Sequence, residues 1–121
     1  SWVLYEYALI NGKKDMQNYF SYQRNSVAFA NIGANGGNAY LQVVDAKKSS
    51  SDTVDLSLAK PGDILVSKGH VEFFNSYLNP SGNYVNIKVY NCGSNASIKA
   101  TGITTSATLN KGDITYILRV K

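Results

Sequence analysis

The sequence predicts an α+β domain, in which a helical first half precedes a strand-rich second half. Apolar residues fill both helical rows of residues 1–12, whereas the pattern changes to strands from Pro61 onward. A chain of 121 residues holds one domain and is too short for two ordinary ones. No internal repeat is visible, so residues 1–121 are expected to form a single domain.

The first predicted element is a helix over residues 1–12, SWVLYEYALING, in which Glu6 is the only charged residue. Because its residues are apolar on nearly every side, this helix is expected to be buried against a sheet. Ser1 is a good N-cap residue, and Asn11-Gly12 is a typical helix end. We therefore expect a core helix whose first turn begins at Ser1.

Less regular segments follow. Residues 13–24 predict a second, shorter helix, and residues 27–30 add another turn. The Gly/Asn stretch 31–38 predicts a loop, and it lacks the Gly-Lys-Ser/Thr ending of a phosphate-binding loop. Residues 45–60 are polar and predict an exposed loop. Strands are predicted at 63–67, 70–78, 83–91 and 113–120.

The turn between the second and third strands suggests which residues face each other. Asn79-Pro80-Ser81-Gly82 has the residue preferences of a type I turn. If Asn79 pairs with Gly82 and no bulge intervenes, His70 stands opposite Asn91 with Cβ atoms ~5 Å apart. The same register sets Phe74 opposite Ile87, and we expect this largely apolar face to meet the core helix.

A histidine that faces an asparagine is a candidate catalytic pair. The Asn carbonyl accepts from one imidazole nitrogen and leaves the other nitrogen to act as a base. For an isolated pair, the simpler interpretation is a core histidine satisfied by a neighbouring amide. A catalytic reading also requires a nucleophile, such as a thiol at a helix N-terminus, where the helix dipole lowers the pKa of the thiol.

Composition excludes several other classes of protein. One Cys and one His exclude a disulfide framework and a zinc site built from these residues. The net charge of +4 favours anionic partners but is too weak to indicate nucleic acid. No apolar run approaches the ~20 residues of a membrane-spanning helix, and no signal peptide is visible. Asp45, Asp52 and Asp55 are too loosely spaced for a calcium loop.

Four segments of the chain resemble one known family. They are SWVLYEYALING, LAKPGDILVSKGHVEFF, VYNCGS and ITYILRVK, and together they cover most of the chain. In this order they resemble the NlpC-type, papain-like cell-wall cysteine peptidases, particularly the catalytic domains of phage lysins (endolysins) of Gram-positive hosts. GHV after PGD is fairly specific, whereas either motif alone is common.

The resemblance implies a papain-like α+β fold in which His70 is the general base and Asn91 is the third, orienting residue. The family places its nucleophilic cysteine at the start of the core helix, and Ser1 lies in that neighbourhood. Either Ser1 occupies the nucleophile position, or the cysteine belongs one or two residues upstream. Without the thiol, the chain as written is expected to be inactive or nearly so.

The resemblance also implies a substrate and a reaction. The expected partner is bacterial peptidoglycan, in which an amide bond of the stem peptide or of its sugar link is cleaved through an acyl-enzyme. Backbone N–H groups at the helix start would form the oxyanion hole. We expect no cofactor, no nucleic-acid partner, no membrane insertion, and an extracellular or cell-wall location. The oligomeric state is left open.

Several alternatives stay open beside this reading. A non-catalytic wall-binding module would keep the fold without the nucleophile. An N-terminal-nucleophile hydrolase would use Ser1 and its own amine, although that class normally needs a longer chain. Cys92 is interpreted as structural, because strand alternation points its sulfur away from the face of His70. For Glu72, an ion pair or a solvent-facing rim position is favoured over a role in modulating His70.

Overall fold

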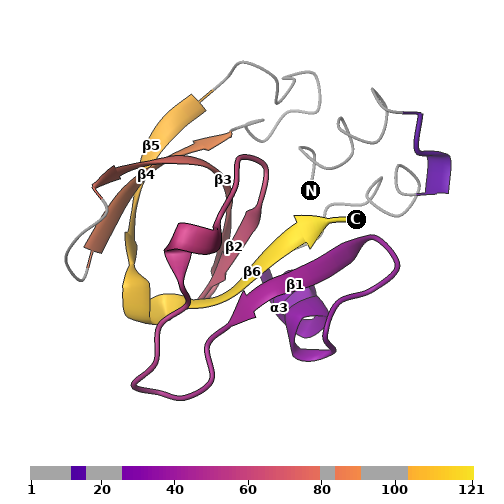
Figure 1. Cartoon of the computed structure of the whole chain (residues 1–121), viewed down its shortest axis with the longest axis horizontal. Coiled ribbons are helices and arrows are strands. Elements are labelled where there is room, and N and C mark those ends of the chain that lie inside the picture. Colours follow the sequence, from indigo (N-terminus) through magenta and orange to yellow (C-terminus); the bar gives the residue numbers. More distant parts are fainter. Residues whose placement is uncertain (1–11, 16–25, 80–83, 91–103) are drawn as a thin grey trace.

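The architecture is known from a computed structural model that describes residues 12–15, 26–79, 84–90 and 104–121 (Figure 1). A helix and a six-stranded antiparallel sheet form its framework, which confirms the α+β class. In chain order the elements are α3 (Ser26–Ala34), β1 (Leu41–Ala46), η1 (Leu56–Leu58), β2 (Ile64–Ser67), β3 (His70–Asn79), β4 (Tyr84–Tyr90), β5 (Thr104–Asn110), η2 (Lys111–Asp113) and β6 (Ile114–Val120).

The strands lie in the order β1-β6-β2-β3-β4-β5. Strands β5 and β6 follow each other in the chain, joined by η2, yet three strands separate them in the sheet. The sheet therefore curls, and Leu109 of β5 packs against a cluster that contains Ile114 and Ile117 of β6. Figure 1 shows β5 bending through η2 into β6.

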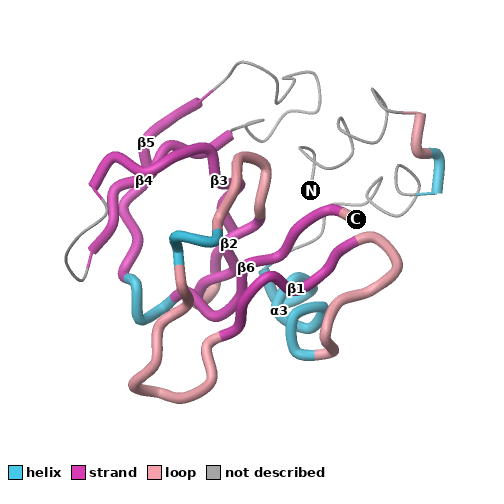
Figure 2. Tube along the Cα trace, viewed as in Figure 1, coloured by secondary structure: helices cyan, strands magenta, loops and turns pink. Residues whose placement is uncertain are grey.

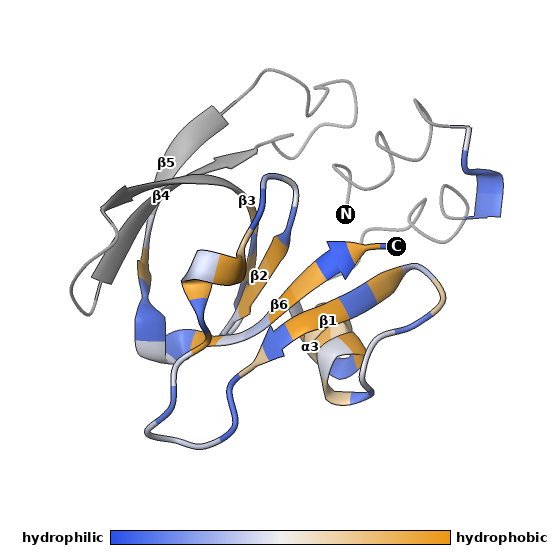
Figure 3. Ribbon diagram, in the orientation of Figure 1, coloured by the Kyte–Doolittle hydropathy of each residue, from blue (hydrophilic) through white to orange (hydrophobic). Residues whose placement is uncertain are grey.

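Each face of the central strands is covered by its own apolar cluster. On one face, Phe29 and Ile32 of α3 pack with Ile64 and Val66 of β2. On the other face, Leu65 packs with residues from the loop after β1 and from β3 and β6, namely Val54, Leu56, Phe74, Ile114 and Ile117. All four residues of β2 are buried as a result, and Figure 3 shows apolar residues along β1, β2 and β6. Strand β2 is thus the centre of the core.

Helix α3 is longer than the sequence predicted. The turn expected at residues 27–30 is confirmed, but the helix runs on to Ala34, so the prediction of a loop from residue 31 was wrong. Gly37 N–H donates to the carbonyl of Ile32 over 2.9 Å, and Gly36 N–H to that of Gly33 over 3.0 Å. Both cap glycines have positive φ, +79° at Gly36 and +106° at Gly37. This is a Schellman cap, so the Gly-Gly pair ends the helix and is not part of a free loop.

Gly33 allows α3 to lie directly on Tyr116 of β6. A Cβ at Gly33 would come within 2.5 Å of the Tyr116 ring. We expect Gly33→Ala to lower the free energy of unfolding by about 1–3 kcal/mol, because the ring or the helix must move away.

The matched control for this variant is Gly112→Ala, whose Cβ would meet its nearest neighbour, Asn110 Oδ1, at an ordinary 3.4 Å. Urea unfolding of both variants checks the prediction. Equal midpoints for Gly33→Ala and the wild type would show that the contact between α3 and β6 yields without cost.

An ion pair holds the Pro61-Gly62 turn that leads into β2. Asp63, with 2% of its side chain exposed, accepts from Arg119 Nε over 2.8 Å and from Nη2 over 2.7 Å. The same carboxylate accepts from Lys60 N–H over 2.8 Å, and Arg119 Nη2 also reaches the carbonyl of Leu58. The hydrogen bonds to Asp63 raise the pKa of Arg119. The pair therefore joins β6 to the turn before β2.

The predicted register of the hairpin between β3 and β4 was wrong. Phe74 pairs with Val89 and not with Ile87, and the register shifts between Phe74 and Ser76 and again between Tyr77 and Asn79. These irregularities are the bulges that the simple turn count left out. The Phe74 face belongs to the cluster on the opposite side of the sheet from α3. Most of the expected core helix over residues 1–12 and of the expected second helix over residues 13–24 lies outside the described residues, as do Pro80-Ser81-Gly82 of the predicted turn.

Candidate functional site

His70 stands at the first position of β3, at the end of a tight hairpin. Its strand partner is Ser67, and Lys68-Gly69 forms the turn between them. Gly69 has a φ of +68°, a conformation that glycine adopts without the usual steric cost. Ser67 Oγ donates to the His70 carbonyl over 3.2 Å, and Lys68 N–H donates to the Asp113 carbonyl. Figure 2 shows β2 and β3 as neighbouring strands near the middle of the sheet. The backbone that carries His70 is therefore fixed from both sides.

The imidazole of His70 is bound by a carboxylate two residues along the strand. His70 Nε2 lies 2.5 Å from Glu72 Oε1. Residues i and i+2 of a strand point to the same face, so the local backbone brings the two side chains together. Of the two side chains, that of His70 is 59% exposed and that of Glu72 only 17% exposed. The carboxylate is therefore packed in place while the ring stays reachable from solvent.

This contact sets the chemistry of the ring. A carboxylate accepts hydrogen bonds, so Nε2 donates and carries a proton in either charge state of the imidazole. In the neutral ring the lone pair then lies on Nδ1, which forms no hydrogen bond with the part of the chain that the structure describes. Nδ1 is the nitrogen that is able to take up a proton.

The other predicted site residues fall elsewhere. Ser1 and Asn91 lie outside the described residues, as does Cys92, so the predicted triad is represented here by His70 alone. Glu72 contacts His70, the partner that the sequence analysis had disfavoured; the contact is a hydrogen bond when the ring is neutral and an ion pair only when the ring is protonated. The signal that points to this partner is the period-2 spacing within GHVE, which places both side chains on one face.

No protein-family model, curated protein or solved structure matches the chain. Within residues 12–15, 26–79, 84–90 and 104–121, no group of three His, Cys, Asp or Glu side chains is placed to hold a metal ion. No helix of those same segments is long and apolar enough to cross a membrane.

The aspartates of the loop after β1 organise its backbone. Asp45 Oδ2 accepts from Asp55 N–H over 2.7 Å, and Asp55 Oδ1 accepts from Ser57 N–H over 3.0 Å at the start of η1. The N–H groups of Lys48 and then Thr53 donate to Asp52 and lower the pKa of its carboxyl. The carboxylates of Asp45, Asp52 and Asp55 thus accept hydrogen bonds from the backbone of the loop and of the start of η1.

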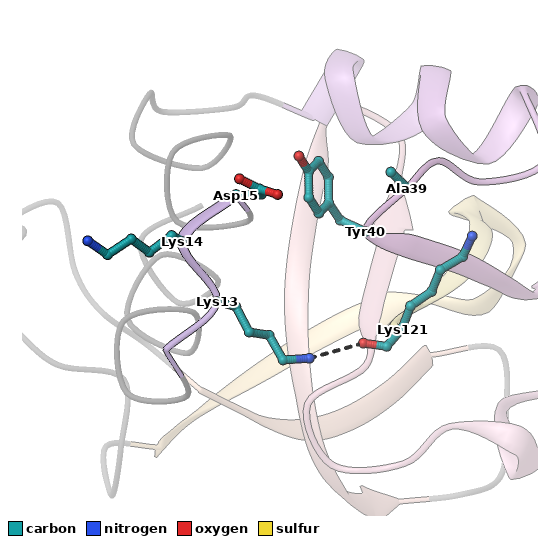
Figure 4. Close-up of a pocket in the computed structure, with 6 residues that line it drawn as sticks. All are labelled: Lys13, Lys14, Asp15, Ala39, Tyr40 and Lys121. Atoms are coloured by element: carbon teal, nitrogen blue, oxygen red, sulfur yellow. Dashed lines mark hydrogen bonds between the residues drawn. The ribbon is translucent and has the colours of Figure 1, made fainter.

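A pocket of about 260 Å³ lies beside the end of β6. It is lined by Lys13, Lys14, Asp15, Ala39, Tyr40 and Lys121 (Figure 4). Lys13 Nζ donates to the carbonyl of Lys121 over 3.3 Å, while the ammonium groups of Lys14 and Lys121 point away from each other. These lysines do not converge on one point, as the side chains of a specific anion site would.

Lys47 has a structural role that the sequence did not indicate. The sequence predicts a solvated lysine pair at Lys47-Lys48. Lys47 is instead half-buried, and its Nζ donates to the Gly112 carbonyl at η2, whereas Lys48 is exposed. Lys47 therefore helps to hold the bend between β5 and β6.

Proposed function

We propose that the chain is a papain-like peptidoglycan hydrolase, in which His70 is the general base for a cysteine at the start of the N-terminal helix. The observation that carries the proposal is the oriented, solvent-reachable imidazole of His70, whose Nε2 is bound and whose Nδ1 has no hydrogen bond to the described residues. The order of the PGD, GHV and YNxGS segments, which resembles that of the NlpC-type peptidases, supports the same reading.

In the proposed reaction, Nδ1 of His70 takes the proton of the thiol, and the thiolate attacks the carbonyl carbon of a peptidoglycan amide. The tetrahedral intermediate collapses as the C–N bond breaks, and the imidazolium gives its proton to the leaving amine. Water, activated by the same nitrogen, then attacks the thioester, releases the carboxylic acid and restores the thiol. In this scheme the nucleophile lies at Ser1 or one or two residues before it, and Asn91 is the third residue that the resemblance implies.

Surface charge is compatible with this substrate. The chain carries a net charge of +4, and Lys13, Lys14 and Lys48 are exposed. Gram-positive walls are anionic, so exposed lysines attract the protein to the wall over roughly one Debye length. This attraction assists encounter and contributes nothing to the chemical step.

A gain-of-function experiment tests the proposal. Cysteine is introduced at Ser1 in one variant and immediately before Ser1 in another, and each is incubated with purified Gram-positive peptidoglycan. We expect one of them to cleave an amide bond, either within the stem peptide or between the stem peptide and its sugar. Mass spectrometry identifies the released peptides and their new free amino groups, and the unaltered chain is expected to release almost none.

His70→Ala in the active variant is the control for contaminating hydrolases. Folded cysteine variants that cleave no peptidoglycan bond would contradict the hydrolase proposal. Sedimentation of such inactive variants with intact walls would favour the non-catalytic binding module.

A further inference from the structure

We propose that Glu72 is a positioning residue for His70, which holds Nε2 and thereby selects Nδ1 as the base. The catalytic consequence rests on the proposed function, whereas the selection of the nitrogen does not. The resemblance assigns the orienting role to Asn91 alone. The geometry points to a carboxylate in that role, on the same strand as the histidine it orients.

The first argument is the geometry of the contact. His70 Nε2 and Glu72 Oε1 are 2.5 Å apart. Phe73, the residue after Glu72, is buried, with only 8% of its surface exposed. Packing of Phe73 and Phe74 fixes the backbone just after Glu72, and pairing of Glu72 with Leu65 of β2 fixes it sideways. The carboxylate is therefore held by the core, while the imidazole is held by the carboxylate.

The second argument concerns charge. When Nδ1 takes a proton, the ring becomes a cation, and a carboxylate stabilises that cation more than a neutral amide does. Lys68, in the preceding turn, is the nearest cationic residue in sequence, and its described contact is made by its backbone N–H with Asp113. Among the described residues, Glu72 is the side chain in contact with the imidazole.

Because the chain has one histidine, nitrogen NMR observes His70 without assignment ambiguity. We expect the neutral ring of the wild type to show a protonated Nε2 and an unprotonated Nδ1, with well separated nitrogen shifts. In Glu72→Ala the two tautomers exchange, so both shifts move toward their mean. Glu72→Asp, whose shorter side chain cannot reach the ring, is expected to behave like Glu72→Ala.

Two further variants make the test specific. Glu72→Gln keeps an acceptor oxygen and is expected to restore the separation of the shifts, which a merely structural role of Glu72 would not predict. Lys68→Ala removes a charge from the same hairpin and is expected to match the wild type. Backbone amide spectra check that each variant is folded.

The proposal is overturned if the wild-type ring is protonated on Nδ1, or if the shifts of folded Glu72→Ala and Glu72→Asp equal those of the wild type. These measurements need neither the introduced cysteine nor a substrate, so they are independent of the hydrolase proposal. In the active cysteine variant, Glu72→Ala is then expected to lower kcat by about tenfold or more with KM little changed. The kcat of Glu72→Gln is expected to lie between that of the active cysteine variant and that of Glu72→Ala.

Discussion

Replacement of His70 with alanine, in the variant that carries the nucleophilic cysteine, is expected to lower turnover by about 10²–10⁴-fold. General-base catalysis requires a nitrogen that is positioned and able to take a proton, and Nδ1 of His70 is that nitrogen in the proposed site. Initial rates of amide cleavage on purified peptidoglycan, at saturating and at low substrate, separate kcat from KM.

Companion variants identify what the loss means. Asn91→Ala separates the two candidate orienting residues: if Asn91 orients the imidazole, as the resemblance implies, kcat falls more than KM rises, whereas if Glu72 does so alone, kcat stays near that of the active enzyme. Lys48→Ala, at an exposed position, is expected to change only the salt-dependent attachment to intact walls. A His70→Ala enzyme whose kcat equals that of Lys48→Ala would remove His70 from the mechanism.

The second large effect concerns stability. Arg119→Met is expected to lower the free energy of unfolding by about 3 kcal/mol, near the lower end of the range for breaking a buried pair. In the variant, Asp63, with 2% of its side chain exposed, loses both hydrogen bonds from the guanidinium. The lower end applies because the Arg119 side chain is itself 28% exposed.

Urea unfolding measures this change, and Lys60→Met is its matched control. Lys60 is exposed and uses its backbone N–H, not its side chain, to contact Asp63, so its loss is expected to cost less than about 0.5 kcal/mol. The double variant Asp63→Asn with Arg119→Met is expected to cost less than the sum of the two single changes. Equal midpoints for Arg119→Met and Lys60→Met would show that the pair contributes no stability.

The four predicted strands are all found, with ends that differ by at most one residue, because each contains a run of apolar and β-branched residues. Strand β1 was missed because it lies between a glycine-rich cap and a polar loop. Strand β5, TTSATLN, was missed because its residues are small and polar and carry no hydrophobic period. Both missed strands lie at the edges of the sheet, where partners on one side alone define them.

The part of the candidate site that depends on neighbouring residues in the sequence could also be predicted. His70 was selected from its motif, whereas the contact with Glu72, which the spacing of two residues on one strand allows, was not the favoured interpretation. The cross-strand pairing depended on counting residues through a turn, and two register shifts made that count wrong. A contact between residues two apart on one strand does not depend on the pairing of the strands, whereas each bulge shifts the cross-strand partner of every residue beyond it.

The position of β6 between β1 and β2 also governs how the chain reaches its native state. Leu41 pairs with Val120, and Ile64 with Leu118, so the centre of the sheet closes only after the strand that comes last in the sequence has been made. Contacts between residues so far apart cost loop entropy before they return any stability, which slows folding. During synthesis, β2 and β3 are made well before β6, which is the other neighbour of β2 in the sheet. The free edge of the apolar strand β2 therefore stays unpaired until β6 has been made.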